Sequence, residues 1–235
     1  MASHPIYQFY AELDDYEPKI WRRFQVIDNI SPARLCYIIQ VLFEMMASHL
    51  MSLEIPFDDV NVTLRFEIME EDFEDFADPH GNVKINDATY GNLRKIGLIP
   101  GNNLNFNYDF GDDWWVSLTL EKVFENKELD GRELPRALEG AGFGIVEGVG
   151  GTSGLEELAK AFKEKKGAEY KQFCDWIGIE NFDMTAFDLD DMNFRLKKIP
   201  RIYKQCYEDR LEPTQQSIDL IERKYLHKKS WHAGN

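Results

Sequence analysis

Alternating hydrophobic and polar positions near the start of the chain predict a β-hairpin. Apolar residues alternate or cluster in residues 6–13 and 20–27, and the polar segment 14–18 between them favours a turn. Residues 60–69 alternate in the same way, so they predict a third strand with one apolar face.

A second hairpin is predicted around Gly111, between residues 103–107 and the alternating series 114–123. Gly111 can adopt a positive φ without steric cost. Three aspartates flank that glycine: Asp109, Asp112 and Asp113. Their carboxylates can accept hydrogen bonds from backbone amides of the turn, so we expect them to stabilise it.

Apolar residues at helical spacing predict an amphipathic helix over residues 32–50. Ser31 is its expected N-cap and Pro32 stands at its first position, where a missing N–H costs nothing. One face of this helix should therefore be buried against the predicted strands.

Later segments predict shorter helices. They are expected over residues 88–96, 154–162, 170–177, 189–199 and 215–229. Asp87, Ser153 and Asp188 are the expected N-caps, and Pro200 should end the fourth of these helices. A Gly-rich loop is expected between residues 133 and 154.

These elements predict a single α+β domain over residues 1–235, because regular strand–helix alternation is missing. Residues 5–125 should form a mainly antiparallel mixed sheet with the first helix across one face. The order of elements suggests a β-grasp-like ββαβ...ββ core. The Gly-rich loop and the C-terminal helices should occupy residues 130–230.

Composition narrows the function classes. The 235 residues are 43% hydrophobic, which is ample for a core, and the formal net charge of −15 disfavours nucleic acid as a partner. The three cysteines form no Cys-x-x-Cys pair, so neither a structural zinc site nor a disulfide framework is indicated. The chain has no targeting signal and no membrane-length apolar run, so we predict a cytoplasmic protein.

Four blocks carry a resemblance to a known family: PKIWRR at 18–23, SHL at 48–50, YDFGDDW at 108–114, and LEG at 138–140 leading to VGG at 149–151. Together with residues 182–190 they resemble the plasmid pRiA4b ORF-3-like family over about residues 5–200. Ala137 replaces the usual Cys of that family, and residues 144–148 replace its Pro-Pro-Glu-Asp run. The resemblance implies a compact α+β fold and no established activity, although some members are passengers of insertion elements.

The carboxylates of Asp109, Asp112 and Asp113 are candidate metal ligands, because hard cations take several oxygen ligands. No calcium-loop spacing is present, so turn formation is their ordinary interpretation. His49 is a candidate general base or metal ligand, or a histidine that caps its helix. The catalytic candidates are His49, Asp109, Asp112 and Glu139.

Two further sets are candidate binding surfaces. The candidate ligand or partner face is aromatic: Trp21, Tyr108, Trp114 and Trp115. The candidate nucleic-acid face is basic: Arg195, Lys197, Lys198, Arg201 and Lys204. The ordinary interpretations are core packing for the first set, and for the second a solvated helix face that balances the acidic segment 67–78.

The leading hypothesis is a non-enzymatic accessory or interaction protein, associated with plasmids or mobile elements, with a protein partner and no cofactor. The alternative is a divalent-metal-dependent hydrolase or nuclease that uses the Asp109, Asp112 and Asp113 turn. Co-location of these aspartates with His49 and Glu139 in one pocket, with two or more of the carboxylates converging within about 5 Å, would favour it. A DNA-binding accessory protein is the second alternative.

Overall fold

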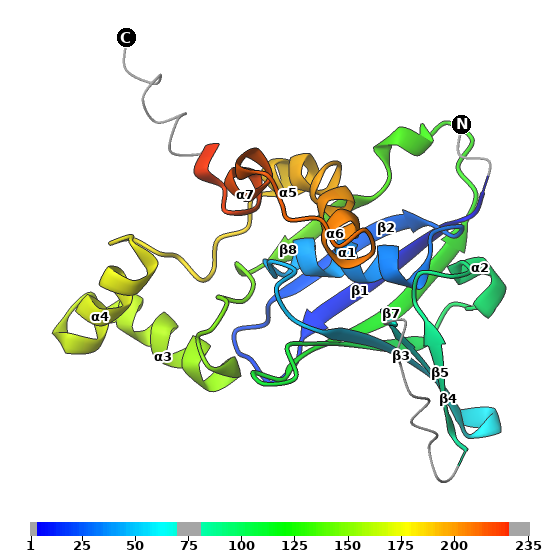
Figure 1. Ribbon diagram of the computed structural model, residues 1–235, viewed down its shortest axis with the longest axis horizontal. Helices are drawn as coiled ribbons and strands as arrows, with labels where there is room; N and C mark the ends of the chain where they lie inside the picture. Colours follow the sequence, from blue (N-terminus) through cyan, green and yellow to red (C-terminus); the bar gives the residue numbers. More distant parts are fainter. Residues whose placement is uncertain (1–3, 70–80, 226–235) are drawn as a thin grey trace.

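The computed structural model describes residues 4–69 and 81–225, which form an α+β fold (Figure 1). The strands are β1 Ile6–Leu13, β2 Trp21–Ile27, β3 Met51–Phe57, β4 Val62–Glu67, β5 Val83–Asp87, β6 Asn103–Tyr108, β7 Trp114–Phe124 and β8 Arg136–Ala141. The α-helices are α1 Pro32–Leu42, α2 Leu93–Ile96, α3 Gly151–Glu164, α4 Gly167–Ile177, α5 Leu189–Leu196, α6 Ile199–Tyr207 and α7 Gln215–Ile221. None of these helices is both long and apolar enough to span a bilayer.

The eight strands form one mixed sheet in the order β5-β4-β3-β6-β7-β1-β2-β8. Neighbouring strands are antiparallel except β4 and β5, which are parallel. The predicted hairpins β1–β2 and β6–β7 are confirmed, and the pairing of β7 with β1 joins them in one sheet. This larger sheet does not confirm the β-grasp-like core that we predicted.

Helix α1 lies across one face of the sheet, and α6 packs on α1 (Figure 1). Ser31 caps α1 as predicted, because its Oγ accepts a hydrogen bond of 3.1 Å from the amide of Arg34. Nearly every residue of α1 is buried, and so are the alternate residues of β1 that face it, such as Phe9 and Ala11. The core therefore lies between α1 and the sheet.

Helix α1 ends at Leu42, so the predicted extension to residue 50 is wrong. Glu44 and Ala47 adopt left-handed φ values of 65° and 60°, which a continuous α-helix excludes. Residues 43–50 instead form a loop, which leads into the unpredicted strand β3. β3 contains Pro56, which lies beyond the part of the strand paired with β6 and therefore removes no donor from that ladder.

Strands β5 and β8 were also missed. β8 lies inside the segment predicted as a Gly-rich loop, and it pairs with β2 from Gln25 to Trp21 at the edge of the sheet. Helix α2 ends at Gly97 as expected but begins at Leu93 under an Asn92 cap, so the Asp87 cap is wrong. Asp87 instead accepts hydrogen bonds from Thr89 in a local turn.

The C-terminal predictions hold in part. Asp188 caps α5 as predicted, but Pro200 lies in the first turn of α6, which begins at Ile199, rather than ending a helix. Helix α3 begins at Gly151 without the predicted Ser153 cap. The end of the predicted helix 215–229 and most of the acidic segment 67–78 lie outside the described residues.

Candidate functional site

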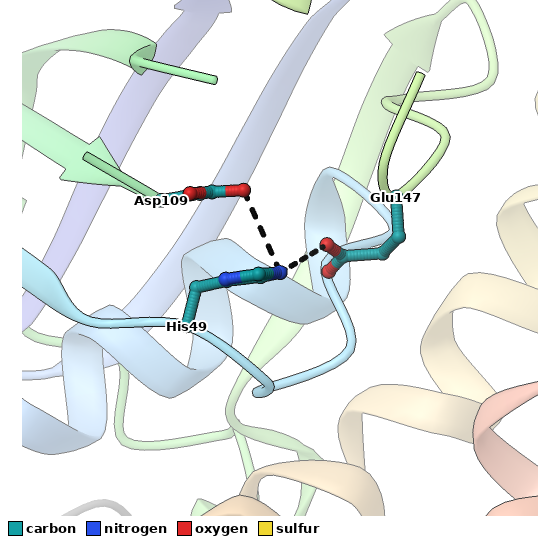
Figure 2. A group of neighbouring side chains, drawn as sticks. All are labelled: His49, Asp109 and Glu147. Atoms are coloured by element: carbon teal, nitrogen blue, oxygen red, sulfur yellow. Dashed lines mark ion pairs between the residues drawn. The ribbon is translucent and has the colours of Figure 1, made fainter. Parts of the chain in front are cut away.

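Three loops that are far apart in the sequence meet at one end of the sheet. They are the loop after α1, which carries His49, the β6–β7 turn, which begins with Asp109, and the segment between β8 and α3, which carries Glu147. Figure 2 shows the side chains of these three residues pointing toward one another. The tertiary structure therefore builds a cluster, which we call the His49 cluster, from His49, Asp109 and Glu147.

Nε2 of His49 lies 3.5 Å from Oδ2 of Asp109 and 3.5 Å from Oε2 of Glu147 (Figure 2). One ligand atom from each side chain lies within 4.8 Å of the other two. Ligands bound at about 2.1 Å around one tetrahedral ion lie about 3.4 Å apart, so both distances from His49 fit ligands of a shared ion. The sequence-predicted carboxylate in this cluster is Asp109, and its companion is Glu147 instead of Asp112, Asp113 or Glu139.

Glu147 is held in place by its other carboxylate oxygen. Oε1 accepts hydrogen bonds of 2.7 Å from the Tyr108 hydroxyl and 2.7 Å from the backbone amide of Met46. Burial raises the pKa of Tyr108, and the charge on Glu147 raises it further, so the phenol stays a hydrogen-bond donor. These contacts leave Oε2 free to face His49.

Oε2 of Glu147 is buried, and no described residue donates a hydrogen bond to it. A buried carboxylate oxygen without a partner is costly. A protonated His49 would offset part of this cost by its charge, whereas a bound cation would offset it by direct coordination. This oxygen would therefore be stabilised by a positive charge at the centre of the cluster.

The hairpin turn orients Asp109. Its φ is 54°, and Oδ1 accepts hydrogen bonds from the amides of Gly111, at 3.1 Å, and Asp112, at 3.4 Å. This confirms the turn-forming role predicted for Asp109 and leaves Oδ2 facing His49. The left-handed residues of this turn are Asp109 and Asp113, so the turn does not use the positive φ that Gly111 could adopt.

The other predicted carboxylates do not join the cluster. Asp112 accepts a hydrogen bond of 3.2 Å from the amide of Gly150, which ties the hairpin turn to the loop before α3. Asp113 accepts hydrogen bonds from side chains of Asn107 and Trp115 instead. Glu139 lies on β8 and pairs with Arg23, which also binds Glu121.

The predicted aromatic residues do not form one face. Tyr108 and Trp114 are buried in the core, whereas Trp115 is half-buried on the opposite face of β7, because neighbouring strand residues point to opposite sides. Trp21 stacks on Tyr10, with ring centroids 5.6 Å apart. Of these four residues, Tyr108 reaches the His49 cluster: its hydroxyl donates to Glu147, and its ring meets the His49 ring edge-on with centroids 5.7 Å apart.

The predicted basic residues are also divided. Arg195 is 1% exposed and binds both carboxylate oxygens of Glu44, at 2.7 and 2.8 Å. Lys204 pairs with Glu208 and Asp209, and Lys198 lies over the ring of Phe194. Lys197 and Arg201 are exposed. Nucleic-acid binding stays a prediction. Arg195 is buried, so its side chain is not accessible to a nucleic acid.

Glu147 was missed from the sequence. It and Glu139 are the carboxylates within the family-like block 138–151, and the sequence predicts a role for Glu139 alone. Glu139 lies on β8, where its carboxylate pairs with Arg23 of β2. The segment after β8 bends back toward the loop after α1, and the amide of Ile145 donates to the carbonyl of Phe43 at 2.9 Å. That loop geometry brings Glu147 to His49, and no local sequence pattern encodes it.

Comparison with known proteins agrees with the resemblance noted from the sequence. A family model described as plasmid pRiA4b ORF-3-like protein matches residues 5–191. The chain is 28% identical over 181 residues to the uncharacterized protein y4hQ of Sinorhizobium fredii, which covers 77% of this chain and 85% of that protein.

A solved structure has the same fold. The crystal structure of the protein of unknown function MM3350 from Methanosarcina mazei Go1 matches with a TM-score of 0.65 and 24% sequence identity. The match covers 80% of this chain and 97% of that one. At this identity the likeness supports the α+β fold alone.

Proposed function

The chain belongs to the plasmid pRiA4b ORF-3-like family, and from that premise and the geometry of the His49 cluster we propose that it is a divalent-metal-dependent hydrolase. The descriptions of the two relatives name no activity, so the proposal rests on the geometry of the His49 cluster. Its single decisive observation is that an imidazole and two carboxylates converge within 4.8 Å from three separate loops. Such a set supplies nitrogen and oxygen ligands of the kinds that divalent transition metals bind.

The donor chemistry favours particular ions. Imidazole suits zinc and iron, whereas carboxylates also suit manganese and magnesium. One imidazole with two carboxylates therefore favours Zn²⁺, Mn²⁺ or Fe²⁺ over Ca²⁺, which takes six to eight oxygens. Tyr108 and the Met46 amide act on Glu147 as supporting hydrogen-bond donors, which fix the orientation of a ligating carboxylate.

Three protein ligands leave coordination positions for water and substrate. The His49 side chain is 42% exposed, so solvent reaches the cluster, while Asp109 and Glu147 are 13% and 14% exposed. A divalent ion held there would supply Lewis-acid chemistry and would make water a better nucleophile. The chain's own residues would hold the ion at a site that stays accessible from outside.

Metal binding is the first test. Protein treated with a chelator would be melted with and without Zn²⁺, Mn²⁺, Mg²⁺ and Ca²⁺. A metal at one hundred times its Kd should add about 2.7 kcal/mol of stability, or about 5–10 °C in Tm for a chain of this size. Asp109→Asn should lose that gain.

Asp113→Asn is the matched control. Both aspartates have a φ of 54° in the same hairpin turn, and asparagine tolerates that conformation. Only Asp109 faces His49, so Asp113→Asn should keep the metal response. Equal loss in both variants would indicate a damaged turn rather than a lost ligand.

Hydrolysis is the second test. The loaded protein would be assayed on a chromogenic ester, a phosphomonoester, a phosphodiester and single-stranded DNA, each with and without chelator. Activity that needs the metal and disappears in Asp109→Asn supports the proposal. Binding of the metal without any such turnover would leave a metal-binding protein and overturn the hydrolase assignment.

The accessory role predicted from the sequence is the second candidate. The observation that favours it is the half-buried stack of Tyr10 and Trp21, with Arg23 5.7 Å from both rings, on the sheet face opposite α1. Exposed aromatic and arginine side chains are enriched at protein interfaces. Association with a plasmid or mobile element and a cytoplasmic location belong to this candidate and are equally proposals.

One comparison separates the two candidates. If no metal stabilises the protein, the accessory role takes the lead, and Trp21→Ala should abolish capture of a specific partner that the parent protein retains. If Trp21→Ala captures the same partners as the parent, the stack is not the interface.

A further inference from the structure

The loop that carries His49 is supported from behind by the C-terminal helices. Residues 43–50 have no regular structure, and left-handed φ values at Glu44 and Ala47 make the backbone unfavourable on its own. Such a conformation persists only where surrounding contacts determine it. The position of His49 therefore depends on what holds this loop.

Two tyrosines of α6, one helical turn apart, donate to carbonyls of the loop. The hydroxyl of Tyr203 donates to the carbonyl of Met45, and that of Tyr207 donates to the carbonyl of His49 at 2.7 Å. Burial raises the pKa of both phenols, so both stay donors at neutral pH. Each bond fixes one side of the turn that presents the imidazole.

Tyr207 is itself held rigidly. Its ring stacks on Tyr37 of α1, with centroids 5.6 Å apart and planes 5° from parallel. Its hydroxyl also lies 3.3 Å from Oε1 of Gln40. The hydroxyl therefore has a defined place between α1 and the His49 loop.

A buried ion pair fixes the start of the same loop. Glu44 binds Arg195 of α5 and Arg223, which follows α7, through contacts of 2.7 and 2.8 Å. Arg223 also binds Asp191 at 2.7 Å. The whole loop thus lies against α5, α6 and the end of α7.

We infer that Tyr207 and Tyr203 are positioning residues for the His49 cluster, so that the helices beyond residue 191 set its affinity for metal. The family match ends at residue 191, before α6 and α7. This inference rests on the proposed metal site. Partners that orient a metal ligand typically change affinity by 10- to 100-fold, so a main-chain anchor should act at the lower end of that range.

The test is Tyr207→Phe, which keeps the stacked ring and removes the hydroxyl. We expect the Kd for Zn²⁺ or Mn²⁺, measured by calorimetric titration, to rise about tenfold. Amides in residues 43–50 should exchange hydrogen faster in the variant, with or without metal. The rest of the chain should exchange as in the parent.

Tyr170→Phe is the matched control, because the Tyr170 hydroxyl also donates to a backbone carbonyl, that of Glu180, at 2.8 Å. It should leave the Kd and the exchange of residues 43–50 unchanged. If Tyr207→Phe matches the parent in both measurements, the positioning role is overturned.

The two proposals fail separately. Faster exchange of residues 43–50 in Tyr207→Phe, in a protein that binds no metal, would retain α6 as the support of the loop and overturn the metal site. Unchanged exchange of residues 43–50 in Tyr207→Phe, in a protein that binds metal, would retain the metal site and overturn α6 as the support of the loop.

Discussion

Nε2 of His49 lies 3.5 Å from Oδ2 of Asp109, although one residue follows helix α1 and the other begins the turn between β6 and β7. A strong hydrogen bond between a charged nitrogen and a carboxylate is about 2.7–2.9 Å long. The observed distance is longer, and the same nitrogen lies 3.5 Å from Oε2 of Glu147. Both distances match the spacing expected for ligands of the ion that we propose.

Glu147→Gln should remove the metal response without unfolding the protein. The amide oxygen of glutamine can still accept from Tyr108 and Met46, so the loop keeps its two hydrogen bonds. The lost charge should abolish the metal-dependent rise in Tm. Glu139→Gln, on Arg23 and away from the cluster, should retain the full rise, and a loss there would argue against the assigned ligands.

Metal affinity should fall as the pH falls. A histidine coordinates metal only as neutral imidazole, and carboxylates coordinate when ionised, so protons compete for His49, Asp109 and Glu147. Calorimetric titrations between pH 8 and pH 5 should therefore give a rising Kd, with protons released on binding. A Kd independent of pH across that range would exclude His49 as a ligand.

Glu44→Gln should destabilise the whole domain. The substitution leaves Arg195, which is 1% exposed, and the largely buried Arg223 without their shared counter-charge. Breaking a buried ion pair by removing one partner costs about 3–5 kcal/mol. Urea unfolding would measure the loss as a lower midpoint.

The surface pair of Lys204 with Asp209 provides the control for that substitution. Both side chains are about half exposed, and such pairs contribute about 0–1 kcal/mol. Asp209→Asn should therefore leave the urea midpoint nearly unchanged. Equal losses in the two variants would mean that the Glu44 pair adds nothing specific.

Glu121→Gln should make stability less dependent on acid pH. Hydrogen bonds from Arg23 lower the pKa of Glu121 below its usual value. A lowered folded-state pKa stabilises the fold above the unfolded pKa of about 4.3, and that contribution disappears as the pH falls through the folded value.

The parent should therefore exceed Glu121→Gln by about 1 kcal/mol at pH 7 and converge with it below about pH 4. Chemical unfolding at a series of pH values gives the comparison. Glu157→Gln, at an exposed position of α3, should follow the parent at every pH. A gap between parent and Glu121→Gln that persists at low pH would contradict the assigned cause.

Local patterns were enough to predict the β1–β2 and β6–β7 hairpins and the caps at Ser31 and Asp188, because each depends on residues close in sequence. The same patterns gave wrong predictions where contacts between residues far apart in the sequence determine the backbone conformation. Residues 43–50 look helical, but the carbonyl of Phe43 accepts from Ile145 and the backbone turns away. Strand β8 was missed because it exists through pairing with β2.

The candidate site divides in the same way. The sequence by itself determined the family, the α+β class, and the two candidate residues His49 and Asp109. Each of these depends on motifs and periodic patterns formed by residues close together in the chain. Only the tertiary structure decided that Glu147 joins them, that Asp113 points elsewhere, and that Arg195 is buried against Glu44. A convergent site is formed by side chains from separate loops, and their distances depend on sheet order and loop packing, which no local pattern of residues contains.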